Sequence, residues 1–328
     1  MTRFSTSRLR RPILIALAAL AASAGPAFAS DPYPTRDIRV IVPFPPGGTT
    51  DVVARTLGAK VGEALGKPVV VDNRAGASGA IGSLAGVRAA PDGYTLTFGN
   101  NQTHSSNASL FSKPAFDFVA DLQPIALLTR TRHIVVVPAS SPYRTLAELT
   151  AGGRQKNLTY ASSSAGASSH LISETLCSSN KMRCTHVPYK GAAPAVLDLI
   201  AGHVDFMVAS YASAVAQVRA GKLRGLAISG DAREAQAPDV PTFSELGHES
   251  LSADSWIGLY APAKTPMPIV RRWSDELGRA IAQKDVREKL EAAGFEVWFK
   301  PVDEFEKFHR SELGRWKGMV ETAGVKLD

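Results

Sequence analysis

The chain has 328 residues, with 37 Lys and Arg against 30 Asp and Glu, and a formal net charge of +7. Four of the basic residues and none of the acidic ones lie in the first 29 positions, so the remainder carries a net charge of only +3. That mild charge, without a basic block, argues against nucleic-acid binding and suits an anionic ligand.

The first 29 residues have the pattern of a secretory signal peptide. Four arginines precede an apolar run at 13–24, and Ala27-Phe28-Ala29 fits a small-x-small cleavage site. The run is shorter than the roughly 20 residues of a membrane span. We therefore expect export to the periplasm with cleavage after Ala29, an uncleaved anchor being the alternative. About 299 residues then remain, which is enough for two domains of about 150 residues.

A strand, an irregular loop and a helix follow one another at the start of the mature chain. Residues 38–42 predict a buried strand, residues 52–57 the first turns of a helix, and 43–51, Pro-Phe-Pro-Pro-Gly-Gly-Thr-Thr-Asp, the loop between them. Gly47 and Gly48 let a ligand approach the backbone, and Thr49, Thr50 and Asp51 are residue types that cap helices. Unpaired amides at a helix N-terminus favour an anion. The loop therefore predicts a binding site for a carboxylate. The alternative is an ordinary capped helix start.

Short apolar strands alternate with helical stretches along the rest of the chain. This alternation predicts an α/β fold with mainly parallel sheets. Strands are expected at 69–71, 94–98, 134–137, 158–161, 186–189, 204–208, 223–229, 255–260 and 295–299, with a polar loop at 99–106. Helices are expected at 81–89, after Thr145, around 171–176, at 194–201, at 271–293 and from a cap at Asp303.

The only cysteines are Cys177 and Cys184. In an oxidising compartment a pair this close in sequence favours a disulfide over a metal or redox site. We expect the bridge to join the end of a helix to the next strand. No histidines stand near it at metal spacing, so no metal is expected.

Several segments carry a resemblance to a known family. Tyr33-Pro34, 38–44 and Pro46-Gly47-Gly48-Thr49-Thr50-Asp51 resemble the start of mature tripartite tricarboxylate transporter receptors, the Bug family of periplasmic solute-binding proteins. The strings Thr103-His104-Ser105-Ser106-Asn107, 162–170 and 187–194 extend the resemblance over nearly the whole mature chain. It implies a two-lobed type II periplasmic-binding-protein (Venus flytrap) fold with the ligand between the lobes. Residues 31–131 plus 260–328 would form one lobe and residues 132–253 the other.

The resemblance also implies which residues meet the ligand. The predicted contacts are Phe44, Gly47, Gly48, Thr49, Thr50, Asp51, Thr103 and His104 in the first lobe, and Ser163, Gly166, Ala167, Ser168 and Asp205 in the second. Asp205 could equally be a structural cap, and Lys190 a counter-ion or a solvated surface residue. The chain departs from the family where Ser164 replaces a usual glycine and Ala167 a usual serine. It also has Ala209 and Ser210 where many members carry an acid, which argues against an amino-acid ligand.

No enzyme motif is present. The chain lacks a G-x-S-x-G elbow, an H-E-x-x-H pair and a P-loop, and no cofactor is expected. We therefore expect a monomeric receptor that captures a small organic carboxylate, such as a di- or tricarboxylate or an aromatic acid, for a membrane permease. The alternatives are an exported sensory protein that signals through a membrane partner and an exported hydrolase using Ser168.

Overall fold

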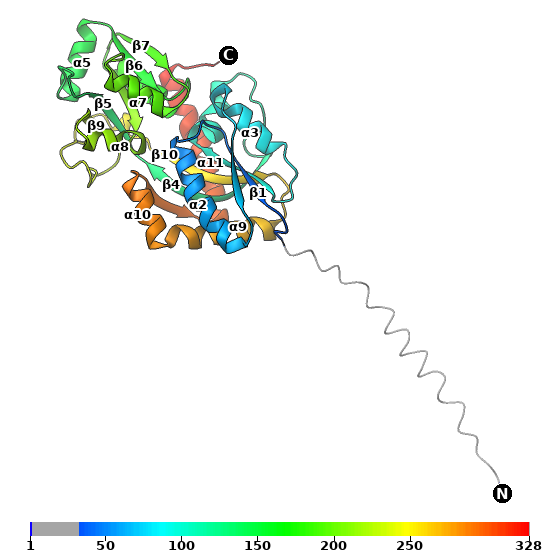
Figure 1. Ribbon diagram of the computed structural model, residues 1–328. Coiled ribbons are helices and arrows are strands. Elements are labelled where there is room, and N and C mark those ends of the chain that lie inside the picture. The colour runs from blue at the N-terminus through cyan, green and yellow to red at the C-terminus, as the bar shows by residue number, and fades with distance from the viewer. Residues whose placement is uncertain (2–32, 328) are drawn as a thin grey trace. The chain divides into compact units, whose positions relative to one another are not determined.

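The computed structural model describes Met1 and residues 33–327. The predicted signal peptide and its cleavage site after Ala29 therefore lie outside the described residues. The chain from Arg36 onward is one compact unit that contains two β-sheets (Figure 1). Within the described part of the chain, no helix is both long enough and apolar enough to cross a membrane.

The first sheet is mixed and has six strands. Its order is β11(Glu296–Lys300)-β4(Leu122–Thr131)-β10(Ser255–Pro262)-β3(Thr95–Asn100)-β1(Ile38–Val42)-β2(Val69–Asn73). Strand β1 runs parallel to β2 and β3, whereas β10 is antiparallel to β3 and β4, and β11 to β4. Its helical segments are α2(Thr49–Leu65), the 3-10 turn Ala77–Gly79, α3(Ala80–Val87), the π-turn Gln102–Ser106, α4(Asn107–Leu110), α9(Met267–Ala282) and α10(Lys284–Ala292).

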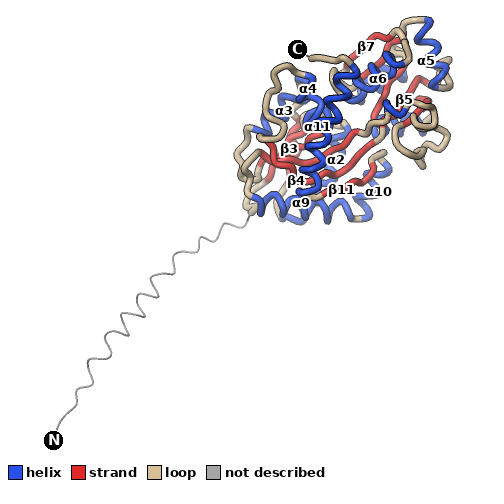
Figure 2. The backbone as a smooth tube through the Cα atoms, turned by 180° about the vertical axis from the view of Figure 1, so that it is seen from behind, coloured by secondary structure: helices blue, strands red, loops and turns tan. Residues whose placement is uncertain are grey.

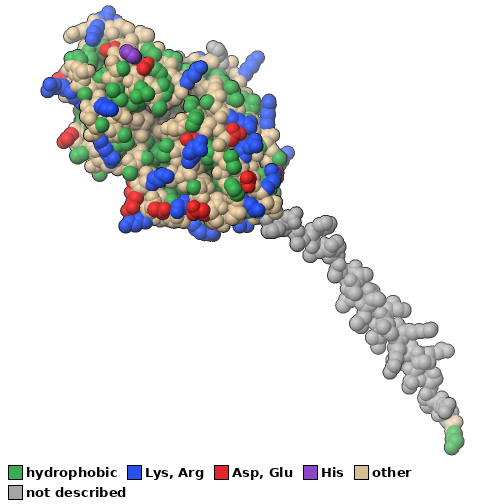
Figure 3. All heavy atoms as spheres, in the orientation of Figure 1, with side chains coloured by type: hydrophobic (Ala, Val, Ile, Leu, Met, Phe, Trp, Pro, Cys, Tyr) green, Lys and Arg blue, Asp and Glu red, His purple; other side chains and the backbone are tan. Residues whose placement is uncertain are grey.

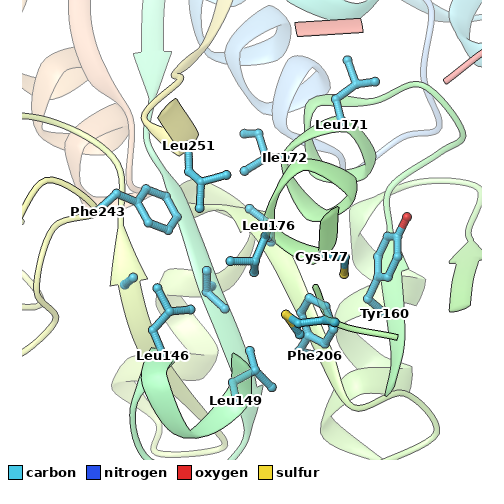
Figure 4. Close-up of a cluster of buried hydrophobic side chains, with 14 of the residues drawn as sticks. Leu146, Leu149, Tyr160, Leu171, Ile172, Leu176, Cys177, Phe206, Phe243 and Leu251 are labelled. Carbon is cyan, nitrogen blue, oxygen red and sulfur yellow. The ribbon is translucent and has the colours of Figure 1, made fainter. Parts of the chain in front are cut away.

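The second sheet has five strands and its own core. Its order is β7(Cys184–Pro188)-β6(Leu158–Ser162)-β8(Phe206–Ser210)-β5(His133–Pro138)-β9(Leu223–Ile228). Its helices are α5(Leu146–Gln155), α6(Ser168–Ser179), α7(Ala192–Ile200) and α8(Tyr211–Arg219). Figure 4 shows buried side chains of α5, α6 and the strands meeting on one face of this sheet.

The chain passes between the sheets twice. Only Arg132 separates β4 in the first sheet from β5 in the second, and the chain returns from β9 to β10 through residues 229–254, which include the short turn Glu249–Leu251. The last helix, α11(Val302–Ala323), packs against both lobes (Figures 1 and 2). Phe305 joins the core of the first lobe, whereas Trp316 and Val320 join that of the second.

Most predicted elements and the predicted disulfide are confirmed. The Cys177–Cys184 bond has an S–S distance of 2.09 Å and joins the end of α6 to the start of β7. The expectation of mainly parallel sheets was wrong, because the strands at the two crossings and β11 run antiparallel to their neighbours. Strand β4 was missed although its segment Ile125–Leu128 is completely buried, since Pro124 interrupts the strand pattern.

Three local predictions need correction, and one helix was missed. Residues 99–106 are not a loop, because Gly99 and Asn100 end β3 and Gln102–Ser106, after the N-cap Asn101, form a π-turn. The predicted helix 271–293 is two helices, because Gln283 is extended at φ −65° and ψ 137°. Helix α11 begins after Pro301 with no side-chain cap, so Asp303 lies inside its first turn. Helix α8 was not predicted at all.

Charged side chains of both signs are present on the face of the molecule shown in Figure 3. On the face shown in Figure 3, Lys and Arg side chains are scattered over both lobes among acidic ones. This distribution agrees with the mild net charge of the mature chain, and this face carries no basic surface of the kind that binds nucleic acid.

Candidate functional site

A cavity of about 110 Å³ lies between the two lobes. Its walls are the loops that follow β1, β3, β6, β7 and β8, together with the starts of β5 and β10 at the crossings. The lining residues are 44–46, 48–50, 100–102, 131, 133, 163, 167–169, 190–194, 207, 210 and 255–257. Loops at strand ends between two lobes are a usual place for a ligand in α/β proteins.

Helices begin at several points of the cavity wall. Gly48, Ala167 and Gly191 are the N-caps of α2, α6 and α7, and none of these helices has a side-chain cap hydrogen bond. Ser210, the N-cap of α8, also lines the cavity, and it too makes no side-chain cap. The first amides of a helix have no partner within the helix and carry its positive partial charge. The cavity therefore favours an anion.

The charged side chains agree with that polarity. Among the described residues that line the cavity there is no Asp or Glu, and Lys190 is the only Lys or Arg. Lys190 is exposed at the rim. A negatively charged ligand thus meets no fixed carboxylate and one cation.

Two buried polar atoms in the wall have no hydrogen-bond partner within residues 33–327. They are Oγ1 of Thr50 and Nδ2 of Asn101, in side chains that are 1% exposed. A buried polar group without a partner costs free energy, so such atoms usually meet a ligand or water. Both belong to residues that line the cavity.

Asp51 and Gly47 shape the loop instead of lining the cavity. The Gly47 amide donates to Oδ2 of Asp51 at 2.9 Å, as does Nε of Arg55, and Nδ2 of Asn73 donates to Oδ1 at 2.9 Å and to the Phe44 carbonyl at 3.1 Å. Burial alone would raise the pKa of Asp51, but these hydrogen bonds hold it below its usual value. Gly48, not Thr49, Thr50 or Asp51, is the N-cap.

Thr103 and His104 lie beneath the cavity wall. Oγ1 of Thr103 accepts from the Asn100 amide at 3.1 Å and lies 2.9 Å from Nδ1 of His104, and both side chains are completely buried. The His104 ring stacks on Tyr260 with centroids 4.2 Å apart. Burial, together with the nearby His309, keeps the pKa of His104 well below its usual value, so the ring is neutral. These contacts hold Asn100 and its neighbours at the wall.

The serine-rich loop of the second lobe is bonded across to the first lobe. Nε2 of Gln102 donates to Oγ of Ser164 at 2.9 Å and to the Ala165 carbonyl at 3.1 Å, and the Ser78 hydroxyl donates to that carbonyl at 2.9 Å. Ser164, where the sequence resemblance implied a glycine, thus supplies an interlobe contact. Gly166 has φ +75°, and a Cβ there would lie 2.6 Å from Cδ1 of Leu110.

A group of titratable side chains supports the same loop from behind. The Gly166 amide donates to Nδ1 of His170 at 3.0 Å, and the His170 and His186 rings stack with centroids 3.7 Å apart. Nε2 of His186 lies 2.6 Å from Oγ of Ser162. Burial, then the neighbouring His170, lowers the pKa of His186 to about 4. The His186 ring is therefore neutral near pH 7.

Asp205 ties two strands together. Its Oδ2 accepts from the Thr159 amide at 2.7 Å and from the Thr159 hydroxyl at 2.9 Å, and so joins the chain before β8 to β6. It is not among the residues that line the cavity. These bonds are of the kind expected of the structural cap that was considered beside ligand contact, and which role Asp205 has stays a prediction.

The predicted site residues divide into two groups. Phe44, Gly48, Thr49, Thr50, Ser163, Ala167 and Ser168 line the cavity, whereas Gly47, Asp51, Thr103, His104, Gly166 and Asp205 lie behind it. Ligand contact by any of them stays a prediction. Sequence reasoning missed lining residues at the ends of β3 and at the crossings, namely Asn100, Asn101, Gln102, Thr131, His133, Ser255 and Trp256. The polar string 100–102 was a usable signal, but the crossings bring residues together from far apart in the chain.

Trp256 is fixed by a buried carboxylate. Glu312 is 3% exposed, and its Oε2 accepts from the indole N–H groups of both Trp256 and Trp316 at 2.8 Å. Helix α11 thereby holds one aromatic wall of the cavity in place.

Comparison with known proteins agrees with this geometry. Residues 53–325 match the family model described as tripartite tricarboxylate transporter family receptor. The chain is 34% identical to BugT of Bordetella pertussis over 318 residues, which cover 96% of each chain. Among solved structures, it is similar to Rpa4515 of R. palustris with adipate, at 30% identity and a TM-score of 0.86 over 90% of this chain and 99% of that one. It is also similar to MatC of Rhodopseudomonas palustris with bound malate, at 34% identity and a TM-score of 0.81 over 88% and 100%.

Proposed function

The chain belongs to the tripartite tricarboxylate transporter receptor family of periplasmic solute-binding proteins, and from that premise we propose that it captures a small organic carboxylate between its lobes. Its fold is the two-lobed type II periplasmic-binding-protein fold, as the sequence resemblance implied. It is a receptor of the solute-binding class and not an enzyme.

The observation that carries the proposal is the polarity of the cavity. Uncapped N-termini of α2, α6 and α7 meet it from both lobes, and its lining includes Lys190 but no acid among the residues described. The unpartnered donors of Thr50 and Asn101 add neutral hydrogen bonds. Amides, hydroxyls and one lysine together suit a carboxylate.

The two liganded relatives support this class of ligand. Their bound molecules, adipate and malate, are both small dicarboxylates. We propose that one carboxylate binds the α2 loop through Gly48, Thr49 and Thr50, with Phe44 beside it, and that Ser163, Ala167 and Ser168 complete the site from the second lobe. In this proposal Gly47, Asp51, Thr103, His104, Gly166 and Asp205 act mainly by holding the loops in place.

Lobe closure is part of the proposed capture. The proposed lobes are residues 31–131 plus 260–328 and residues 132–253, with α11 packing against both. A ligand that contacts both lobes favours the closed arrangement, and the contacts of Gln102 with Ser164 and Ala165 stabilise it further. We further propose cleavage after Ala29, residence in the periplasm as a monomer, and delivery of the ligand to membrane permease subunits.

A ligand screen on the mature chain, residues 30–328, tests the function. The protein is first unfolded, separated from any bound ligand and refolded. Thermal-shift assays then test di- and tricarboxylates, aromatic acids, amino acids and uncharged analogues of the acids. An acid at 100 times its Kd stabilises the protein by about 2.7 kcal/mol, and calorimetry then gives its affinity. Folded protein that responds to none of the acids, or equally to the uncharged analogues, contradicts the proposal.

A further inference from the structure

His133 stands where both interlobe crossings meet the cavity. It is the first residue of β5, it is 1% exposed, and it lines the cavity together with Ser168 of α6 and Ser255 of β10. Nε2 of His133 lies 2.8 Å from Oγ of Ser168 and 3.2 Å from Oγ of Ser255, and the two hydroxyl oxygens are 3.1 Å apart. Three segments distant in sequence thus place one imidazole nitrogen and two hydroxyls at one point of the wall.

The other ring nitrogen fixes the tautomer. Nδ1 of His133 lies 2.7 Å from the carbonyl oxygen of Ala253, which can only accept a hydrogen bond. Nδ1 therefore carries a proton. In the neutral ring Nε2 is then a hydrogen-bond acceptor. One of the two serine hydroxyls donates its hydrogen bond to Nε2 and is not available to a ligand.

A count of protons shows what protonation changes. With His133 neutral, Ser168 and Ser255 have two hydroxyl protons, and one of them is directed to Nε2. At most one is left for a ligand. When Nε2 is protonated it donates to a serine oxygen, and both hydroxyl protons become available to an anion beside them.

We propose that His133, Ser168 and Ser255 form a proton-linked subsite for one carboxylate of the ligand. As the anion binds to the two hydroxyls, Nε2 of His133 takes up a proton from solvent and donates it to a serine oxygen. The inference rests on the proposed function and adds to it a coupling between ligand capture and pH.

The charged groups around the ring are few. Asp254, beside Ser255, accepts from the Ser229 hydroxyl at 2.7 Å and favours the charged imidazole, while Arg130, 3.9 Å from Asp254, and the α6 N-terminus oppose it. Arg132, next in sequence, lies 3.5 Å from Glu234, and Lys190 stands at the cavity rim. Burial lowers the pKa of His133, against the opposing effects of the Ala253 hydrogen bond and Asp254.

The direction in which pH changes the affinity follows from the lowered pKa of His133. Without ligand the lowered pKa leaves His133 neutral at pH 7. A carboxylate next to the ring raises that pKa, so affinity is full below the ligand-free pKa and falls as pH rises through the ligand-bound pKa. An opposite charge within about 4 to 6 Å shifts a pKa by about 1 to 3 units, so the Kd should rise about tenfold or more across the window.

Calorimetry on the mature chain tests the subsite. The probe is the acid that binds best among malate, adipate, citrate and benzoate, titrated between about pH 5 and pH 8.5 in two buffers of different ionisation enthalpy, with the ionisation of the acid itself subtracted. We expect net proton uptake on binding and a Kd that rises at least about tenfold with pH. His133→Asn and Ser255→Ala should both flatten the pH dependence. His203→Asn, at an exposed site paired with Asp198 and outside the cavity, should keep it.

The outcomes separate this inference from the function itself. Binding with a constant Kd and no proton uptake overturns the subsite but not the receptor function, as does a pH dependence unchanged in His133→Asn. Failure of all four acids to bind counts against both. If the His133→Asn variant does not fold, the subsite is tested with Ser255→Ala and with an NMR titration of the histidine C2 protons. One of the seven histidine pKa values must rise on binding and respond to Ser255→Ala, or the proposal is wrong.

Discussion

Thr50→Val separates ligand binding from folding because the structure predicts effects of opposite sign. Oγ1 of Thr50 is buried in the cavity wall and has no partner among the residues described, so in ligand-free protein the hydroxyl is a cost. Valine has nearly the same shape, and its helix propensity is close to that of threonine. The substitution removes one polar atom and leaves the first turn of α2 otherwise unchanged.

The magnitudes follow from the proposed contact. A hydrogen bond to a charged group contributes about 1.5–3 kcal/mol, so losing the bond from Thr50 to a ligand carboxylate should raise the Kd about tenfold to a hundredfold. Removing a buried hydroxyl that lacks a partner should leave the free energy of unfolding unchanged or raise it by up to about 1 kcal/mol.

Two measurements on the same protein check both signs. Urea unfolding of ligand-free protein gives the stability, and calorimetry with the acid identified by the screen gives the Kd. Thr56→Val is the matched control, since Thr56 is a buried threonine of the same helix that does not line the cavity. Thr50→Val with wild-type affinity would refute the assignment of this hydroxyl to the ligand. A loss of stability above about 1 kcal/mol would show that the hydroxyl has a structural partner.

Three further predictions concern charge and covalent structure. Lys190→Gln should raise the Kd of a dicarboxylate about two- to fivefold and that of a monocarboxylate less. Lys222→Gln, away from the cavity, should change neither Kd. Calorimetry that gives the same loss of affinity for both acids in Lys190→Gln would contradict this prediction. Asp51→Asn should cost about 2 kcal/mol of unfolding free energy at pH 7. Because the folded pKa of Asp51 lies below 3.8, its contribution is complete above that value and disappears as pH falls through the folded pKa, so urea unfolding should show a smaller acid-dependent loss in the variant. Replacing Cys177 and Cys184 with serine should lower the unfolding free energy by about 2.5 kcal/mol, as reductant should for the wild type but not for the variant.

Local patterns in the sequence were enough to predict most strands and the disulfide. Strand Ile38–Val42 is apolar except for the exposed Arg39, and Thr145 has its capping partner Glu148 three residues later, so each signal lies within a few residues. The direction of the strands at the crossings could not be predicted from such local signals. It depends on pairings such as His133 with Ser210 and Trp256 with Arg130, which no local pattern specifies.

The same limit explains what was missed in the site. Asp51 is the last residue of the predicted loop and belongs to a residue type that binds ligands, yet its carboxylate accepts hydrogen bonds from Gly47, Arg55 and Asn73. Only the packed structure shows which polar groups in such a loop have partners and which do not. His133 and Ser255 lie 122 residues apart and meet only because two crossings run side by side.

The helices that begin at the cavity do so without a side-chain cap. Helix α5, which does not line the cavity, begins at Thr145, whose hydroxyl accepts from the Glu148 amide at 3.1 Å in the ordinary way. At α2, α6 and α7 the N-caps are glycine or alanine, which have no side-chain acceptor, so no side chain caps the first amides there; α9, α10 and α11, away from the cavity, also begin without a side-chain cap. A serine in place of Ala167 could accept from the first amides of α6 and so compete with a ligand. The departure at Ala167 therefore removes a hydroxyl from the wall, and it also leaves more of the α6 N-terminus to bind an anion.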